Sequence, residues 1–369
     1  MDTITSTAPK RSQDLLKTKQ HFEILDGLRG IAAIVVVIFH FLEWVYSDYS
    51  KNFAGHGFLA VDFFFCLSGF VIAYAYDDRI GRMGVTEFFK SRLIRLHPLV
   101  VLGSVLGLLA FLFDPFSAPP AGYDAGKIAL LFLASILLVP YPVMPERSFN
   151  LFGLNAPAWS LFWEYIANIV YAWVLCKLSK RTLLAIAVAA AACLCYVGYT
   201  AGNLMGGWGK STFWHGGARI AYSFTAGMLV YRYNIVIKNR LGFAGLTILL
   251  LAALLMPWFK QNWLAELAVV ILYFPLLIAL GAGSRLTAGA RGICVFSGKI
   301  SYPLYMTHYA VIWTFANYYN QYKPGTVQLT WMVSIAIVVL TGIAYLVMIW
   351  YDIPVRRYFT SKRKLSKHK

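Results

Sequence analysis

The sequence predicts an all-α integral membrane protein, a bundle of about ten transmembrane helices with one further re-entrant or interfacial segment. Of the 369 residues, 59% are hydrophobic and only 13% are charged, and the mean hydropathy is +0.62. Apolar runs recur at lengths near ~20 residues, the length that an α-helix needs to cross about 30 Å of hydrocarbon. Lys and Arg residues are also concentrated in alternate loops, which is typical of cytoplasmic loops.

Eleven apolar segments follow one another along the chain. Eleven full spans would leave the basic cluster at 177–181 and every later basic loop outside the cell. The fourth segment is short and ends at Pro140 and Pro142, so we expect it to be re-entrant or interfacial. Ten spans then remain, and both termini are cytoplasmic. The eleven segments cover residues 28–46, 57–76, 96–113, 127–142, 157–176, 182–199, 216–232, 241–257, 263–281, 299–316 and 329–350.

In this topology, 26 of the 33 Lys and Arg residues lie in cytoplasmic segments. The net charge of +17 therefore reflects topology and contact with membrane lipids, and we expect no nucleic-acid partner. We expect a cytoplasmic tail at 1–24, a membrane domain at 25–355 and a basic cytoplasmic tail at 356–369. The five cysteines lack metal-ligand spacing, so no metal is expected.

The first apolar segment carries two ionisable residues, Arg29 at its start and His40 inside it. Eleven residues separate them, which is about three helical turns, so they share one face about 16 Å apart. Ionisable groups in a membrane are costly and usually face a cavity or a partner. Arg29 also fits a topology anchor and His40 a hydrogen-bonded packing residue. Their shared face favours a functional role.

Two acidic residues also lie inside apolar segments. Asp62 lies early in its segment at a depth comparable with His40, and we expect it to orient or pair with that imidazole. Glu164 is the only acid in segment 157–176. We expect it to position a substrate hydroxyl or to pair with Arg219, because intramembrane carboxylates are rare without a function.

Arginines mark the cytoplasmic edge of the third segment. Arg92 and Arg95 are three residues apart and therefore share a helix face. Together with Arg29 they form a cationic mouth that suits phosphate groups. Each arginine taken singly also fits the ordinary excess of positive charge on the cytoplasmic side.

Three further residues are candidates for contact with a substrate. Arg219 opens the seventh apolar segment, and His308 lies inside the tenth. Trp159 lies toward the outer face, where tryptophan usually belongs to the interfacial aromatic belt. An exposed indole can also stack on a sugar ring. We therefore expect Arg219, His308 and Trp159 on the substrate side of the site.

Six stretches, in order, resemble the motifs of the acyltransferase-3 family of integral-membrane O-acyltransferases. In the last of them Asp352 stands where the family usually has glutamate. Each stretch alone is a weak signal, but six in order across nearly the whole chain are specific. The stretches are LDGLRGIAAIVVVIFH, VDFFFCLSGFVIA, RLIR, WSLFWEYIANIVYAW, ISYPLYMTH and YDIPVRRYF.

This resemblance implies a role for each matched residue. His40 would be the essential catalytic residue, Arg29 would bind the donor together with Arg92 and Arg95, and Glu164 would lie on the acceptor side. The implied donor is acyl-CoA, commonly acetyl-CoA. The implied acceptor is a hydroxyl of a sugar-containing molecule at the outer face, such as an exopolysaccharide unit on a lipid carrier. The chain resembles standalone members without an SGNH domain, in the inner membrane of a bacterium.

Two other classes remain open. A transporter or flippase would also have buried ions along its path, although no inverted repeat or matched pair of broken helices is evident. A membrane-bound O-acyltransferase of the other multipass class would use an intramembrane histidine late in the chain, whereas the best-placed histidine here is His40. The sequence does not decide whether His40 acts as a general base or accepts the acyl group first.

Overall fold

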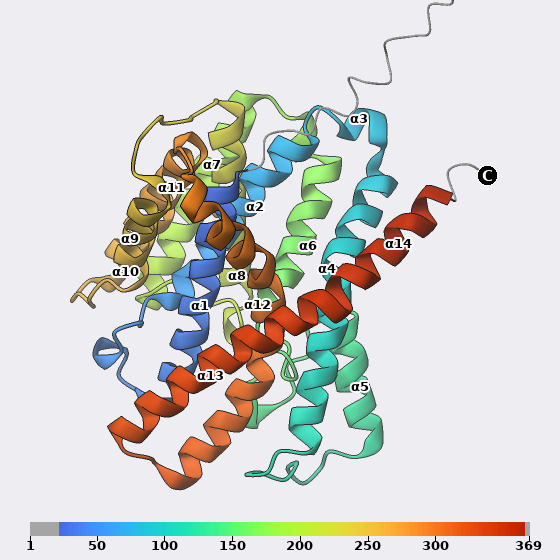
Figure 1. Cartoon of the computed structure of the whole chain (residues 1–369), viewed down its shortest axis with the longest axis vertical. Helices are drawn as coiled ribbons and strands as arrows, with labels where there is room; N and C mark the ends of the chain where they lie inside the picture. The colour runs from blue at the N-terminus through green and yellow to red at the C-terminus, as the bar shows by residue number, and fades with distance from the viewer. Residues whose placement is uncertain (1–21, 366–369) are drawn as a thin grey trace, which may run out of the picture.

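The computed structural model describes residues 22–365, which form a bundle of helices (Figure 1). Within this range the only β-type pairings are two isolated bridges, Asn150 with Gly209 and Asn239 with Ser284. The prediction of an all-α protein is thus confirmed. Residues 1–21 and 366–369, which include most of the two expected cytoplasmic tails, lie outside the described residues.

Each of the eleven predicted apolar segments falls on a helix. Short π-helical turns at Val269–Tyr273 and Met348–Asp352 join α10 to α11 and α13 to α14 without a break. The helices are α1 (Glu23–Val45), α2 (Ala60–Tyr76), α3 (Ile80–Met83), α4 (Val85–Leu112), α5 (Ala125–Ile136), α6 (Ala158–Trp173), α7 (Lys180–Ala201), α8 (Phe213–Arg232), α9 (Gly242–Leu254), α10 (Asn262–Ala268), α11 (Phe274–Gly283), α12 (Ala288–Tyr322), α13 (Thr326–Val347) and α14 (Ile353–Leu365).

Six helical stretches in the described part of the chain are long and apolar enough to cross a membrane, by length and composition. The expected count of about ten spans is not confirmed. Helix α5 has 12 residues, about 18 Å in length, and so agrees with the expectation that segment 127–142 does not span. The six stretches are Glu23–Val45, Gly57–Tyr76, Val85–Leu112, Lys180–Ala201, Asn262–Gly283 and Thr326–Arg363.

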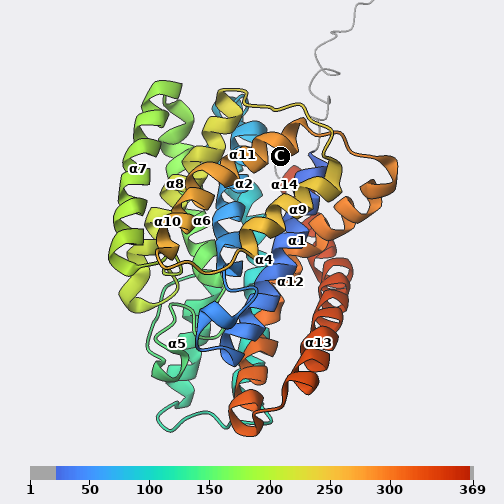
Figure 2. The ribbon, with the colours of Figure 1, turned by 90° about the vertical axis from the view of Figure 1, so that its left-hand side faces the viewer.

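Helices at the edges of the bundle expose apolar side chains. Helices α7 and α13 lie at opposite edges in Figure 2. Val188 on α7 is 63% exposed and Val338 on α13 is 71% exposed. Apolar surface of this kind is stable in contact with lipid tails rather than water. The long apolar helices and these faces identify an integral membrane protein.

The centre of the bundle depends on close contacts between helix backbones. Helix α1 packs along α12, and α2 packs along α8. A Cβ atom on Gly69 of α2 would collide with the backbone carbonyl of Phe224 on α8, and a Cβ on Gly227 of α8 would collide with that of Cys66. Small residues allow such an approach between membrane helices. Gly69 of the LSGF stretch therefore forms part of this contact.

The last helix runs diagonally across the front of the bundle (Figure 1). It continues from Thr326 through the π-helical turn to Leu365, and its end packs against α4. The expected boundary at residue 355 falls inside this continuous helix. Residues 356–365 are therefore an ordered part of the fold that lies beside α4.

We predict that Gly69→Val lowers the free energy of unfolding by about 3 kcal/mol or more, because the added atoms meet the α8 backbone, which cannot rotate away as a side chain can. The measurement is the thermal midpoint of the detergent-solubilised protein, followed by tryptophan fluorescence. Gly342→Val on α13 is the matched control, since no atom lies within 4 Å of its Cβ position. Equal midpoints for the two variants would contradict the close α2–α8 contact.

Candidate active site

His40 forms a hydrogen-bonded pair with a carboxylate on its own helix. Its Nδ1 lies 2.7 Å from Oε1 of Glu43, one turn further along α1, where residues i and i+3 are neighbours. An ionised Glu43 accepts the Nδ1 proton, which leaves Nε2 with its lone pair. The pair therefore has the arrangement of a histidine base oriented by an acid.

This pair lines a cavity of about 250 Å³ between α1, α12 and the loops around residues 148 and 208. The cavity wall is rich in aromatic rings, and Arg147 and Arg219 also reach it. Trp159, expected on the substrate side, is among the lining residues. A cavity with aromatic walls and a few polar groups suits an organic ligand with hydroxyl groups. The aromatic lining residues include Trp44, Tyr49, Trp159, Trp208, Tyr305, Tyr309 and Trp313.

His308 stacks on His40, with ring centroids 5.4 Å apart. Its Nδ1 lies 3.1 Å from the carbonyl oxygen of Leu304 on the same helix, so Nδ1 donates and Nε2 is the acceptor. This Nε2 atom is buried and has no hydrogen-bond partner among the described residues. The structure thus brings two sequence-predicted residues, one from α1 and one from α12, into direct contact.

Asp62 does not pair with His40, which corrects the expectation from depth alone. Arg219 of α8 donates to both of its carboxylate oxygens, with Nη2–Oδ2 at 2.6 Å and Nε–Oδ1 at 3.0 Å. Arg219 also donates to the carbonyl oxygens of Gly206 and Phe58. Both side chains are almost completely buried. This saturated pair joins α2 to α8 and supports the cavity wall.

Glu164 pairs with Arg92 rather than with Arg219. Arg92 Nη2 lies 2.7 Å from Glu164 Oε1, and the Ser68 hydroxyl donates to the same oxygen at 3.0 Å. The group therefore joins α2, α4 and α6. It brings Glu164 to Arg92, one of the arginines expected at the donor site, and Glu164 is absent from the lining of the His40 cavity.

Arg29 is held against α12 near the start of α1. Its Nε donates to the Ser301 hydroxyl at 2.9 Å, its Nη2 donates to the Gly298 carbonyl at 2.8 Å, and Asp26 lies 3.1 Å from Nη2. It also interacts electrostatically with Arg95. Arg29 and His40 therefore stand on one helix, as predicted, and Arg29 belongs to the end of the bundle where Arg95 lies.

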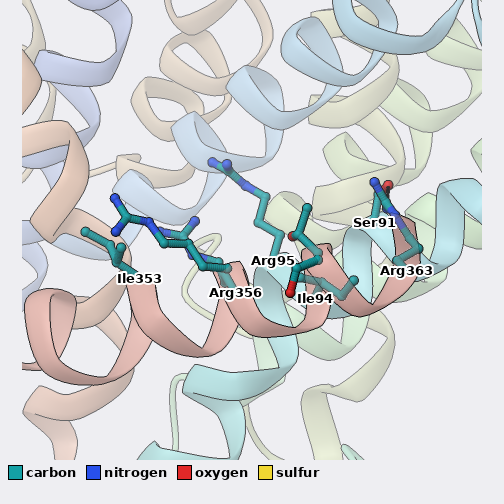
Figure 3. Close-up of a pocket in the computed structure, with 9 residues that line it drawn as sticks. Ser91, Ile94, Arg95, Ile353, Arg356 and Arg363 are labelled. Atoms are coloured by element: carbon teal, nitrogen blue, oxygen red, sulfur yellow. Dashed lines mark hydrogen bonds between the residues drawn. The ribbon is translucent and has the colours of Figure 1, made fainter. Parts of the chain in front are cut away.

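Arg95 lines a second, basic pocket of about 500 Å³ between α4 and α14 (Figure 3). Arg356, Arg357 and Arg363 of α14 line it from the other side. Arg363 donates to the Ser91 hydroxyl at 2.5 Å, and Arg356 forms an ion pair with Asp352 at 2.6 Å. Arg363 also lies 3.9 Å from Glu87. The four guanidinium groups around this pocket have the chemistry that suits phosphate groups.

Sequence reasoning missed several residues of these two cavities. Glu43 was detectable, because the spacing HFLE places an acid one turn after His40. The α14 arginines were interpreted as a tail, since nothing in a basic terminal stretch shows that it folds back onto α4. No motif or spacing in the sequence marked Arg147 as a site residue, because only the loop conformation brings it to the cavity. Among residues 22–365, no group of three or more His, Cys, Asp or Glu could hold a metal ion.

A histidine–carboxylate pair in an aromatic cavity of a membrane bundle, with a separate basic pocket between α4 and α14, suits a membrane-embedded enzyme that uses a histidine base. Comparison of the sequence with family models agrees. The acyltransferase domain that defines the acyltransferase-3 family matches residues 22–350. The chain therefore belongs to the acyltransferase-3 family. This membership favours an enzyme over the transporter that buried charges alone left open.

Several named proteins are similar to parts of the chain. "Protein 2 in picA locus" of Rhizobium radiobacter is 37% identical over 183 residues, 46% of this chain and 92% of that protein. "Acyltransferase MdmB" of Streptomyces mycarofaciens is 30% identical over 154 residues, 40% of this chain and 37% of its own. A Staphylococcus aureus (strain COL) protein with the provisional name O-acetyltransferase SACOL0978 is 33% identical over 124 residues, 32% of this chain but 19% of its own. No solved structure matches the chain significantly.

We predict that Asp62→Ala destabilises the fold by about 3–5 kcal/mol, because it leaves Arg219 charged and buried without its carboxylate. Thermal unfolding in detergent measures the effect. The double variant Asp62→Leu/Arg219→Met, which removes both charges, should recover most of the loss.

The control for this experiment is Asp48→Ala. Asp48 forms an exposed ion pair with Lys51 at 3.8 Å, and such pairs contribute at most about 1 kcal/mol. If Asp62→Ala unfolded no earlier than Asp48→Ala, the Asp62–Arg219 pair would not have the structural role assigned to it.

Proposed function

We propose that the chain transfers an acyl group, acetyl above all, from acyl-CoA bound at the basic pocket to a sugar hydroxyl in the His40 cavity. The observation that carries this proposal is the His40–Glu43 pair, with a 2.7 Å contact, on the wall of an aromatic cavity. Arg29 stands about three turns away on the same helix face, about 16 Å along the axis. The thioester reaches the imidazole along this face.

His40 acts in this proposal as a general base. The acceptor hydroxyl attacks the thioester carbonyl carbon while its proton moves to Nε2 of His40, and Glu43 stabilises the imidazolium that forms. The carbon–sulfur bond then breaks, the thiolate takes the proton, and an ester and free CoA leave. The second route is transfer of the acyl group first to Nε2 and then to the hydroxyl. Asp62 and Glu164 remain positioning residues in both routes.

The donor site in this proposal is built from the arginines of α4 and α14. CoA carries a diphosphate and a 3′-phosphate, and guanidinium groups bind phosphates through paired N–H donors. Arg95, Arg356, Arg357 and Arg363 supply these donors around the pocket. The carboxylate of Glu164 holds Arg92 behind them. The position of the cationic groups supports a cytoplasmic location for this pocket, since CoA is a cytoplasmic metabolite and Lys and Arg are concentrated on that side.

The acceptor in this proposal is a sugar-containing molecule at the outer face, either an exopolysaccharide unit on its lipid carrier or another cell-surface glycan. Trp159, Trp208 and Trp313 line the cavity, where an indole can pack against a sugar ring. His308, expected on the substrate side, is fully buried behind His40 and absent from the cavity lining, so in this proposal it supports the His40 imidazole. The enzyme would lie in the inner membrane with both termini cytoplasmic. The provisional O-acetyltransferase name of the Staphylococcus aureus relative agrees with acetyl as the transferred group.

We predict that His40→Ala abolishes transfer of labelled acetyl from acetyl-CoA to glycan in membranes that contain the protein, because general acid–base catalysis contributes about 10²–10⁴-fold. Glu43→Gln should lower the rate at least about 10-fold, since the amide orients the ring but cannot stabilise an imidazolium.

The matched control is Glu23→Gln at the other end of α1, where the carboxylate pairs with the exposed Arg291; its rate should stay within about twofold of the wild type. Protein amount is equalised by immunoblot. A His40→Ala protein that transfers acetyl at the wild-type rate would remove His40 from the chemistry, and a wild type without transfer would reject the donor or the acceptor class.

We predict that the enzyme distinguishes acetyl-CoA from acetyl-dephospho-CoA, with KM about 10-fold or more higher for the donor that lacks the 3′-phosphate, since hydrogen bonds to charged groups are worth about 1.5–3 kcal/mol. Arg357→Gln/Arg363→Gln should remove this difference and leave kcat nearly unchanged. Arg240 is an exposed arginine outside the pocket, and the control variant Arg240→Gln should keep the difference in KM between the two donors. Equal KM values in the wild type would show that this pocket does not bind the nucleotide end.

A further inference from the structure

Arg147, a buried arginine on the cavity wall, forms no ion pair with the residues that the structure describes. Arg147 is 7% exposed and lines the cavity beside His40. Its Nη1 donates to the carbonyl oxygen of Gly153, which uses one of the five guanidinium donors. Among residues 22–365, no carboxylate lies within 4.0 Å of this side chain. The remaining donors have no protein acceptor in the described part of the chain.

The other charged groups of the cavity are already engaged. Arg219 is neutralised by Asp62 at 2.6 Å, and Glu43 is hydrogen bonded to His40 at 2.7 Å. Tyr309 interacts electrostatically with both Glu43 and Arg147. Glu146 and Asp114 attract Arg147 electrostatically from beyond the 4.0 Å limit of an ion pair. Within the residues that the structure describes, the charge of Arg147 is therefore the one that the cavity leaves without a contacting counter-ion.

Two aromatic rings flank the guanidinium but do not replace a counter-ion. The guanidinium carbon lies 4.6 Å from the ring centre of Trp313 and 5.0 Å from that of Phe111. Cation–π contacts contribute about 0.5–2 kcal/mol, whereas a buried unpaired charge costs several kcal/mol. Burial lowers the pKa of Arg147 to about 10, so the side chain stays charged at neutral pH.

The loop that carries Arg147 is held in an unusual conformation. Ser148 and Phe149 have φ angles of 53° and 50°, in the left-handed region that residues other than glycine rarely adopt. Backbone hydrogen bonds fix the loop to the segment around residue 209: Leu151 N–H donates to the Trp208 carbonyl at 2.8 Å, and Lys210 N–H donates to the Phe149 carbonyl at 3.1 Å. Strained backbone held by its surroundings is common at ligand-binding sites.

We propose that Arg147 binds an anionic group on the acceptor, a carboxylate or a phosphate, while a neighbouring hydroxyl reaches His40. The planar guanidinium matches both groups through paired N–H donors. A neutral acceptor in the same position leaves the buried charge unpaired, and this penalty makes the site selective for acidic glycans. The transfer step rests on the proposed acyltransferase function, whereas the binding of the anion does not.

Tryptophan fluorescence can test this site, because Trp44, Trp159, Trp208 and Trp313 line the cavity. The purified full-length protein is titrated with three sugars that differ at carbon 6: methyl glucoside, methyl glucuronide and methyl glucoside 6-phosphate. We expect at least about 10-fold tighter binding of one or both acidic sugars than of the neutral one. A preference between the two acidic sugars identifies the carboxylate or the phosphate as the group recognised.

Variants assign the preference to Arg147. Arg147→Met should bind all three sugars with the affinity that the wild type has for methyl glucoside, and Arg147→Lys should keep part of the preference. The control Lys210→Met removes an exposed cation near the same loop and should change nothing. Equal binding of the three sugars by the wild type, no saturable binding of any of them, or a preference that survives Arg147→Met would overturn the inference.

Acetyl transfer to the same three sugars is measured separately. Loss of transfer with the acidic preference in binding intact would reject the acyltransferase proposal and leave the anion site standing. Transfer to all three sugars at equal kcat/KM, with no preference in binding, would reject the anion site and leave the acyltransferase proposal standing. The wild-type titration decides between these outcomes even if Arg147→Met fails to fold.

Discussion

The burial of charged side chains in an apolar bundle is the constraint on which this structure depends. Each buried arginine needs a counter-ion, because an unpaired charge away from water costs several kcal/mol. Arg219 pairs with Asp62 and Arg232 pairs with Asp77, so two ion pairs join α2 to α8 at different levels. A third, Arg92 with Glu164, joins α4 to α6. Apolar faces alone have little preference for one another in lipid, so these pairs fix which helices are neighbours and in which register.

The partners of each buried charged group distinguish charges that hold the fold together from charges that are available to a ligand. Asp62 and Glu164 looked catalytic in the sequence because acids are rare in membrane segments, yet each is engaged by an arginine. His40 keeps a free Nε2 because Glu43 takes its other nitrogen, and Arg147 keeps most of its donors. Chemistry is therefore assigned to groups whose hydrogen bonds the fold leaves incomplete, rather than to groups that are merely ionisable and buried.

Much of the fold and part of the site could be predicted from the sequence. Helical periodicity along one segment is local information, so the relation of Arg29 to His40 and the positions of the helices followed from spacing. Contacts between residues on different helices could not be predicted from spacing. The depth of Asp62 in its apolar segment fits a position near His40 as well as a position near Arg219. Loop geometry was also beyond reach: the left-handed Ser148 and Phe149 bring Arg147 into the cavity, and no motif marks that turn. The fold-back of residues 356–365 onto α4 depends on tertiary packing in the same way.

Helix α1 keeps one face over several turns, from the end of the bundle where Arg95 lies to the His40 cavity. Positions 29, 40 and 43 differ by at most about 60° around the axis at 100° per residue, so one helix face carries a cation toward the basic pocket and the His40–Glu43 pair in the other cavity. In the proposed function the donor and the acceptor come from opposite sides of a bilayer about 30 Å thick. A rigid helix spans that distance without moving, and α12, packed along it, supplies Ser301 at one level and His308 at the other. In that proposal the donor reaches the acceptor along α1, and no carrier has to cross the membrane.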